Sequence, residues 1–171
     1  KKWPIGKIDA LLSQAENIII QEEKRAAKHA TLVPGMKEIV KYLYHNNIKL
    51  GIITLNTTKN TILSLEKVNL IQFFNKKWIV GRDRTPEIKP AKQHAIELLK
   101  RMNITDPKTT CLIGDHPTDI EVANKINCRS IAILNGNYPD EAYPTTYMIK
   151  KENIFPKLRH HLQKFIESDY K

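Results

Sequence analysis

Apolar residues recur at helical spacing over residues 8–29, and a different pattern begins at Pro34-Gly35. The apolar positions of this first stretch are Ile8, Leu11, Leu12, Ala15, Ile18 and Ile19. Spacings of three and four residues place these side chains on one face of an α-helix. The pattern therefore predicts one long helix within residues 1–33, which we interpret as a linker helix or a remnant of a small helical cap.

Residues 34–171 alternate between short apolar runs and amphipathic stretches. The runs predict strands at residues 49–54, 77–80, 110–114, 130–134 and 146–149, and the stretches predict helices at 36–46, 57–68, 90–102, 119–126 and 156–168. The helix at 90–102 is expected to begin with Pro90 at its favoured first position. Strands and helices in alternation are joined by right-handed crossovers. We therefore expect an α/β fold, a three-layer αβα Rossmann-like core with a mainly parallel sheet.

Composition excludes some classes of protein and leaves others open. The chain of 171 residues contains no run of about 18 apolar residues, so we expect no membrane span. Cys111 and Cys128 lie beside apolar, strand-like residues, which favours buried, reduced thiols in a cytoplasmic protein over a disulfide framework. The net charge of +10 attracts phosphates and nucleic acid, but the lysines are spread along the whole chain. A nucleic-acid partner therefore stays open without being favoured.

Polar residues follow three of the predicted strands, where open α/β sheets bind their ligands. They are Thr54, Lys89, and the acidic loop from Gly114-Asp115 to Asp119. Thr54 alone is better explained as a β-branched strand residue or as a loop hydroxyl that satisfies nearby backbone, and Lys89 is one lysine among many. Thr118 and Glu121 fit a capping box, so Asp119 is also typical of a helix N-terminus. Capping does not explain Asp115, whose carboxylate is a suitable ligand for Mg²⁺.

The order Thr54, then Lys89-Pro90, then Gly-Asp-x-x-x-Asp resembles three motifs of the haloacid dehalogenase superfamily, over roughly residues 34–168. Within it the chain is similar to the phosphoglycolate phosphatase-like hydrolases. The resemblance implies a Mg²⁺-dependent phosphatase acting on a small phosphorylated metabolite. It assigns Thr54 and Lys89 to the transferring phosphoryl group, with Asn56 assisting, and Asp115 and Asp119 to the metal. Leu55 separates Thr54 from Asn56, which departs from the family's usual adjacent pair.

The superfamily's nucleophile, the first aspartate of an Asp-x-Asp pair at the end of the first strand, is absent from this sequence. Asp9 lies in the first predicted helix, and Asp83 follows a later strand. A central strand buries several apolar side chains, which contribute on the order of 10 kcal/mol, comparable to the net stability of a domain. We therefore expect an upstream segment to supply the strand, and we expect residues 1–171 alone to be inactive.

Other classes of protein fit the motifs less well. A response-regulator receiver has its acidic residues before the threonine and lysine, whereas Asp115 comes last here. A dinucleotide-binding domain needs Gly-x-Gly-x-x-Gly after an early strand, which is absent. The alternative that stays open is a non-catalytic relative that binds phosphate or nucleic acid. The sequence specifies neither the substrate, among phosphoglycolate, sugar phosphates and nucleotides, nor an oligomeric state.

Overall fold

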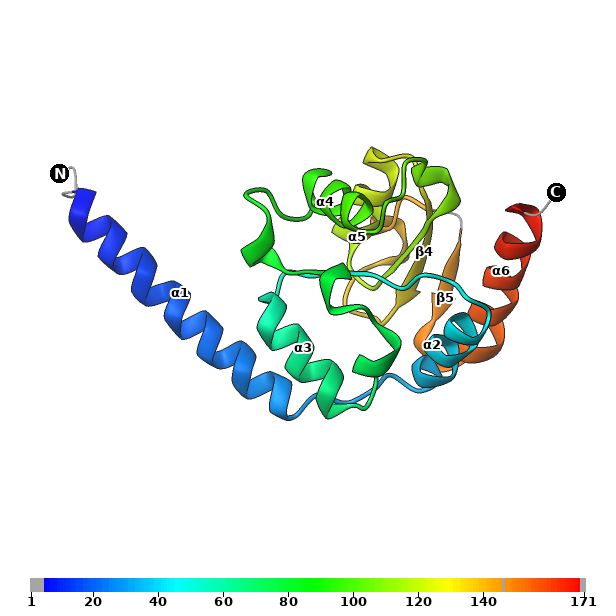
Figure 1. Cartoon of the computed structure of the whole chain (residues 1–171), viewed down its shortest axis with the longest axis horizontal. Coiled ribbons are helices and arrows are strands. Elements are labelled where there is room, and N and C mark those ends of the chain that lie inside the picture. The colour runs from blue at the N-terminus through cyan, green and yellow to red at the C-terminus, as the bar shows by residue number, and fades with distance from the viewer. Residues whose placement is uncertain (1–4, 146, 170–171) are drawn as a thin grey trace.

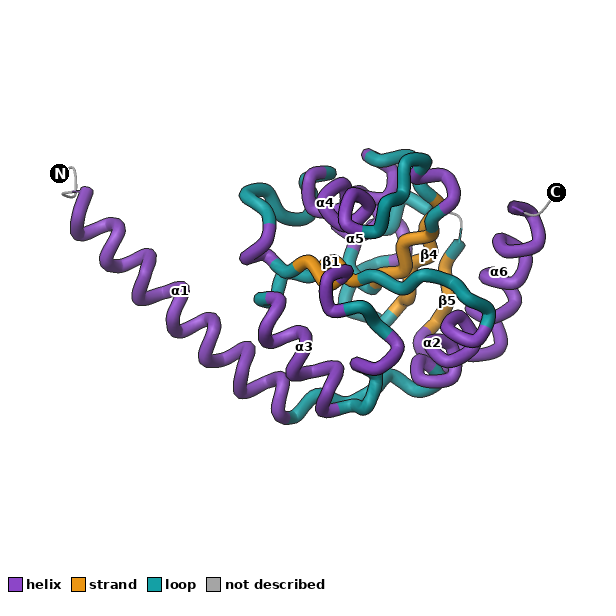
Figure 2. Tube along the Cα trace, viewed as in Figure 1, coloured by secondary structure: helices purple, strands orange, loops and turns teal. Residues whose placement is uncertain are grey.

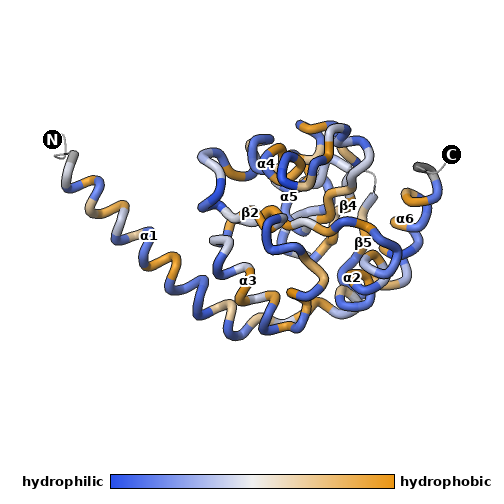
Figure 3. The backbone as a smooth tube through the Cα atoms, viewed as in Figure 1, coloured by the Kyte–Doolittle hydropathy of each residue, from blue (hydrophilic) through white to orange (hydrophobic). Residues whose placement is uncertain are grey.

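A long helix, α1 (Ile5–Lys28), extends away from the rest of the protein (Figure 1). The structure is a computed structural model and describes residues 5–145 and 147–169. Apolar residues recur along α1 (Figure 3), and their exposed side chains are Ile8, Leu11, Leu12, Ile18 and Ile19. No helix in the described ranges is both long and apolar enough to cross a membrane.

A polar cluster holds α1 against helix α3 (Thr58–Lys67). The Oε2 atom of Glu23 accepts hydrogen bonds from the backbone N of Thr57 at 3.0 Å and from Nδ2 of Asn60 at 3.1 Å. Its Oε1 atom forms an ion pair with Arg82, which also pairs with Glu16 at 2.8 Å. Because these contacts come from Glu16 and Glu23, the part of α1 before Glu16 carries none of this docking.

The strands pair in parallel, as predicted, but they form two separate sheets within the described residues (Figure 2). One sheet contains β1 (Ile52–Ile53) and β2 (Ile79–Val80). The other has the order β3 (Cys111–Gly114), β4 (Arg129–Leu134) and β5 (Met148–Lys150). β1 is shorter than the strand predicted at 49–54, because its pairing with the two-residue strand β2 extends only over Ile52 and Ile53. The predicted start of the last strand, Thr146, lies outside the described residues.

Helices cover both faces of these sheets, which confirms the expected α/β architecture. The remaining α-helices are α2 (Met36–His45), α4 (Gln93–Arg101), α5 (Pro117–Lys125) and α6 (Ile154–Asp169). Short 3₁₀ helices occupy Ile71–Phe73, Lys76–Trp78, Arg82–Arg84, Pro107–Thr109, Asp140–Ala142 and Lys151–Asn153. In Figure 1, α4 and α5 lie on one side of the strands and α2 and α3 on the other.

Strand β4 is the centre of the hydrophobic core. Ile131 and Ile133 pack with buried residues of α2, α6 and β5, whereas Ala132 packs with Ile120 of α5 and with Tyr143. Successive side chains of a strand point to opposite faces, so one strand contributes to both layers. The core therefore fixes β3, which lies beside β4, between two layers of helices.

Two helix starts differ from the prediction. The helix expected to begin at Pro90 begins at Gln93, since the chain first makes a turn in which the N–H of Ala91 donates to the carbonyl of Ile88 at 2.9 Å. The Lys89-Pro90 peptide bond is cis. The helix expected from residue 119 begins instead at Pro117, which suits the first helical position because it has no N–H to satisfy.

Candidate active site

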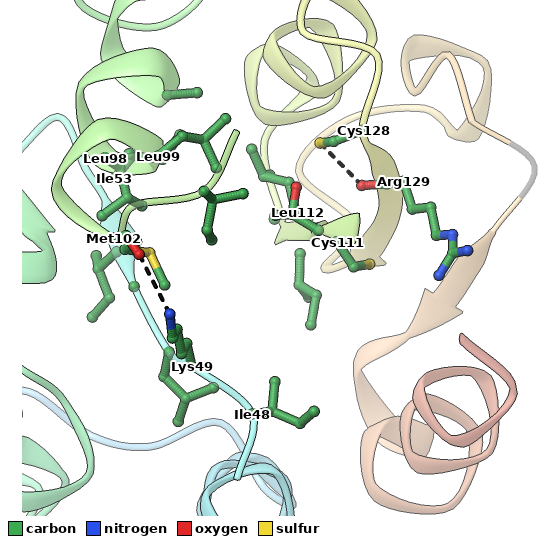
Figure 4. A pocket seen from close by; sticks show the side chains of 18 of the residues that line it. Ile48, Lys49, Ile53, Leu98, Leu99, Met102, Cys111, Leu112, Cys128 and Arg129 are labelled. Carbon is green, nitrogen blue, oxygen red and sulfur yellow. Dashed lines mark hydrogen bonds between the residues drawn. The ribbon is translucent and has the colours of Figure 1, made fainter. Parts of the chain in front are cut away.

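A cavity of about 790 Å³ separates the two sheets. Residues of β1 and β3 line it together, and Figure 4 shows Ile53, Leu98 and Met102 across it from Leu112 and Cys111. In the described part of the chain, β1 pairs only with β2, and β3 pairs only with β4. Each of these strands therefore presents one edge without a strand partner toward the cavity.

Four of the five predicted site residues lie along this cavity. Thr54 follows β1 and Asp115 follows β3, while Lys89 and Asp119 come from a loop and from the first turn of α5. The carboxyl ends of β1 and β3 thus deliver a hydroxyl, an ammonium and two carboxylates to one region. Asn56 is not among the residues that line the cavity.

The Lys89 ammonium contacts both sides of the site, the end of β1 and the first turn of α5. Its Nζ atom lies 2.6 Å from Oδ1 of Asp119 and 3.5 Å from the carbonyl oxygen of Ile53. The side chains of Lys89 and Asp119 are only 10% and 8% exposed, so solvent screens this ion pair weakly. Lys89 therefore places a positive charge between the ends of β1 and β3.

The glycine of the Gly-Asp-x-x-x-Asp motif allows Asp119 to fold back over the end of β3. A Cβ atom at Gly114 would lie 2.4 Å from Oδ2 of Asp119, which no real contact tolerates. The Oδ2 atom also accepts a hydrogen bond from the backbone N of His116 at 3.2 Å. Asp119 thus combines a helix-capping role with its ion pair to Lys89.

The predicted capping box of Thr118 and Glu121 is wrong. The N-cap is His116, whose Nδ1 accepts a hydrogen bond from the N of Thr118 at 3.1 Å, and Asp119 completes the box. The helix begins earlier than expected because Pro117 takes its first position, which moves the cap to the residue before it.

A loop after β4 orients the Asp115 carboxylate. Nδ2 of Asn135 donates to Oδ2 of Asp115 at 3.1 Å, and Oδ1 of Asn135 accepts from the N of Asn137 at 2.9 Å. The hydroxyl of Tyr143, a side chain only 3% exposed, donates to the backbone carbonyl of Asp115 at 2.9 Å. Burial raises the pKa of Tyr143, so this phenol keeps its proton. Sequence reasoning missed Asn135 and Tyr143, whose loop showed only polar, turn-forming residues.

The hydroxyl of Thr54 forms a local turn at the edge of the cavity. Its Oγ1 atom accepts from the backbone N of Asn56 at 3.2 Å, and the carbonyl of Asn56 accepts from the N of Arg82 at 3.1 Å. A threonine hydroxyl that accepts one bond retains its own proton to donate to a ligand. Asn56 therefore contributes backbone groups that shape the turn around Thr54.

A buried histidine, which sequence reasoning also missed, lies behind Lys89. His94 is 0% exposed, and its imidazole contacts the backbones of Val80 and Lys89. Burial lowers the pKa of His94 below its usual 6.5. The signal in the sequence was its helical spacing with Ala95, Leu98 and Met102, which places a polar ring on an apolar helix face.

The acidic residues suit a magnesium ion that keeps other oxygen ligands. In the described ranges, no three His, Cys, Asp or Glu side chains gather as a metal cluster. Mg²⁺ is commonly held by one or two carboxylates, with water and substrate phosphate completing its shell. Asp115 is exposed and has one oxygen, Oδ1, for which no hydrogen bond occurs among the described residues. The donor set therefore fits Mg²⁺ with Asp115 as a direct ligand.

The other aspartates considered as nucleophiles lie in structural roles. Oδ1 of Asp83 accepts from the N and Oγ1 of Thr58 at 2.6 and 2.9 Å. Although burial opposes ionisation, these hydrogen bonds lower the pKa of Asp83. Asp9 is exposed on α1. Neither residue lines the cavity.

Both cysteines are free thiols, and each is partly rather than fully buried, which is less than predicted. They line the cavity, and burial raises the pKa of Cys111 to about 12. A thiol with such a pKa stays protonated at neutral pH and is a poor nucleophile. Cys111 therefore lines the cavity but is not suited to act as a nucleophile.

Comparisons with known proteins agree with this architecture. The family described as "Haloacid dehalogenase-like hydrolase" matches residues 4–133. The phosphoglycolate phosphatase of Pseudomonas syringae pv. syringae is 25% identical over 131 residues, which are 77% of this chain and 47% of that protein. Phosphoglycolate phosphatase 1 of Pseudomonas aeruginosa is 27% identical over 116 residues, 67% of this chain and 42% of that protein. The chain thus spans about half the length of these curated relatives.

Solved structures show the same fold. A HAD hydrolase of family IA, variant 3, from Entamoeba histolytica superposes with a TM-score of 0.69 at 18% identity, covering 87% of this chain and 67% of that one. The β-phosphoglucomutase of Clostridium difficile gives a TM-score of 0.67 at 21% identity, covering 86% and 64%. At these identities, the likeness establishes the fold alone.

Proposed function

Because the chain belongs to the haloacid dehalogenase-like hydrolase family, we propose that it carries the phosphoryl-binding and metal-binding part of a Mg²⁺-dependent phosphatase. Its substrate class is a small phosphate monoester. The observation that carries this proposal is the meeting of Thr54, Lys89, Asp115 and Asp119 along one cavity between β1 and β3. Phosphoryl transfer depends mainly on positioning and on positive charge near the phosphoryl oxygens, which this set supplies.

Each side chain has a role that its surroundings support. The Lys89 ammonium, held by Asp119 at 2.6 Å, neutralises charge on the phosphoryl group. The Thr54 hydroxyl donates a hydrogen bond to a phosphoryl oxygen, and the nearby backbone amides assist. Asp119 orients Lys89, and its remaining contact with the His116 amide fixes it at the start of α5.

The Asp115 carboxylate holds the metal ion, and Asn135 and Tyr143 hold Asp115. When bound, Mg²⁺ supplies positive charge to the phosphoryl oxygens and orients the phosphate monoester. Asp119 would lie near the metal ion and contributes by holding Lys89, in keeping with its hydrogen bonds to Lys89 and to the His116 amide.

The nucleophile reaches the site on a strand that enters the cavity between β1 and β3. Its aspartate attacks phosphorus while the bond from phosphorus to the ester oxygen breaks, and a second aspartate protonates the leaving alcohol. Water then hydrolyses the aspartyl-phosphate, which releases inorganic phosphate and restores the carboxylate. The two open strand edges and the apolar walls of the cavity support this placement.

The experiment is hydrolysis of p-nitrophenyl phosphate by the natural protein with and without Mg²⁺. We expect Mg²⁺-dependent release of phosphate, and we expect Lys89→Met to lower kcat about 100-fold or more, the loss typical of a removed electrostatic group. Lys92→Met, an exposed lysine three residues away, is the matched control and keeps wild-type kcat. Equal activity of the two variants contradicts the role of Lys89.

A substrate panel follows from the names of the relatives. Phosphoglycolate comes first, because the matched relatives are phosphoglycolate phosphatases. A sugar phosphate and a nucleotide complete the panel. Tight binding of phosphate without turnover of any member would favour the non-catalytic phosphate-binding alternative.

A further inference from the structure

His94 is a fully buried polar side chain whose two ring nitrogens both have backbone partners. Its Nε2 atom lies 2.9 Å from the carbonyl oxygen of Val80, and its Nδ1 atom lies 3.3 Å from the backbone N of Lys89. An apolar residue would fill the same volume without needing partners. A buried ring that satisfies two backbone groups therefore indicates a requirement for those hydrogen bonds.

The partners determine where the imidazole proton lies. A carbonyl oxygen only accepts, so Nε2 must carry the proton that it donates to Val80. An amide N–H only donates, so Nδ1 must be unprotonated to accept from Lys89. The geometry is consistent only with the neutral Nε2–H tautomer, because a second proton would bring two N–H groups against each other.

The same carbonyl also holds the turn that carries Thr54. The backbone N of Thr54 donates to the carbonyl of Val80 at 3.1 Å, so this oxygen accepts from both Thr54 and His94. One continuous chain of hydrogen bonds thus runs from the Thr54 amide through Val80 and His94 to the Lys89 amide. Val80 is itself 0% exposed, so water cannot replace these bonds readily.

We propose that His94 is a positioning residue that sets the separation of Thr54 and Lys89, the two side chains assigned to the phosphoryl group. The proposal rests on the function proposed above. His94 does not contact the reacting atoms; it fixes the backbones from which both side chains extend. The charged groups that act on it electrostatically are Lys89 and Asp119, which are paired with each other.

Kinetics of three variants test the proposal in the natural protein. His94→Leu removes both hydrogen bonds, and we expect kcat for p-nitrophenyl phosphate to fall about 100-fold, the effect of a displacement of about 1 Å in a catalytic group. His94→Asn retains an acceptor near the position of Nδ1, so it should recover part of kcat. Leu158→Ala, a cavity in the core under α6, is the control for lost stability and should leave kcat unchanged.

Equal kcat values in the Leu and Asn variants, both folded by circular dichroism, would overturn the hydrogen-bonding role. A wild-type protein that releases no phosphate would instead refute the proposed function. NMR of the imidazole nitrogens gives a test that requires neither activity nor a substitution. It should show a neutral ring at pH 7 with the proton on Nε2, and a proton on Nδ1 would overturn the proposal.

Discussion

Lys89 and Asp119 form an ion pair from which water is largely excluded, with side chains 10% and 8% exposed. Breaking such a pair leaves an uncompensated charge near the core, which typically costs about 3–5 kcal/mol. We expect Asp119→Asn to lower the free energy of unfolding by about 3 kcal/mol, because the amide preserves the helix cap but not the charge. Urea unfolding of the natural protein measures this change. A loss as small as that of Glu121→Gln, an exposed partner of Lys125, would contradict it.

We propose that Asn135 affects metal binding through Asp115, to which its amide donates a hydrogen bond. The N–H of Asn137 donates to Oδ1 of Asn135, which directs Nδ2 toward the carboxylate. Partners of a metal ligand commonly contribute 10–100-fold to metal affinity. We expect Asn135→Ala to weaken Mg²⁺ binding by about tenfold or more in calorimetric titration. Asn17→Ala, on exposed α1, is the control, and equal affinities in the two variants would exclude this role.

His94 makes stability depend on pH. Burial lowers the pKa of His94 in the folded state, whereas in the unfolded state it stays near 6.5. The unfolded chain therefore binds the proton first as the pH falls. The contribution of His94 to stability is complete above about pH 6.5 and decreases as the pH falls toward the lowered pKa.

Urea unfolding from pH 8 to pH 5 measures this dependence as the difference between wild type and His94→Leu. The comparison matters because burial also lowers the pKa of His161, which titrates in both proteins. We expect the wild type to lose more stability than the variant between pH 6.5 and pH 5. Parallel pH profiles would show that His94 is not a neutral, doubly bonded ring.

At the scale of elements, the hydrophobic pattern predicted the order and type of helices and strands from α1 to α6. It succeeded because each element buries one face, as β4 does with Ile131 and Ala132. It failed at the starts of α4 and α5, where Pro90 and Pro117 have the same local preference but different surroundings. A proline suits the first position of a helix, but it is also compatible with a turn. Only tertiary contacts determine which of the two structures forms.

The pattern also could not predict that the sheet is divided. Residues 49–54 and 110–114 are apolar runs typical of buried strands, but each has a strand on only one side in the described structure. The prediction that Thr54, Lys89 and Asp115 lie close together followed from the position of each residue after a predicted strand. Asn135 and His94 form hydrogen bonds with backbone groups and other side chains, and neither belongs to a motif. The helical spacing of His94 was a signal for a polar ring on an apolar face, but it did not indicate a role.

A strand in the cavity makes a specific prediction for β1. The N–H of Thr54 points to β2, where it donates to Val80, so the N–H of its neighbour Ile53 points toward the cavity. If a strand occupies the cavity of the natural protein, the Ile53 amide is hydrogen-bonded and exchanges slowly with solvent. Amide hydrogen exchange followed by NMR measures this rate. Exchange of Ile53 as fast as that of an amide in an unfolded peptide would contradict the placement of the strand.

At the scale of the whole molecule, the chain spans about half the length of the matched relatives, and the four side chains that we propose for the phosphatase site lie along one cavity. The cavity of about 790 Å³ lies between β1 of one sheet and β3 of the other. A central strand in that position would join the two sheets and stabilise the protein by on the order of 10 kcal/mol. The same strand would then complete both the sheet and the active site.

The basic charge of the molecule fits this account without requiring nucleic acid. A net charge of +10 raises the local concentration of any phosphorylated ligand. In the function that we propose, recognition depends on Lys89, a largely buried side chain that pairs with Asp119. A cytoplasmic location, in which both cysteines remain thiols, is the setting that we propose.

The most direct test is a crystal structure of the natural protein with Mg²⁺ and orthovanadate, an analogue of the transferring phosphoryl group. We predict the vanadate within hydrogen-bonding distance of Thr54 Oγ1 and Lys89 Nζ, the metal ion on Asp115, and a strand between β1 and β3 that ends in an aspartate facing the vanadium. Vanadate bound away from Thr54 and Lys89, with no strand between β1 and β3, would contradict the account.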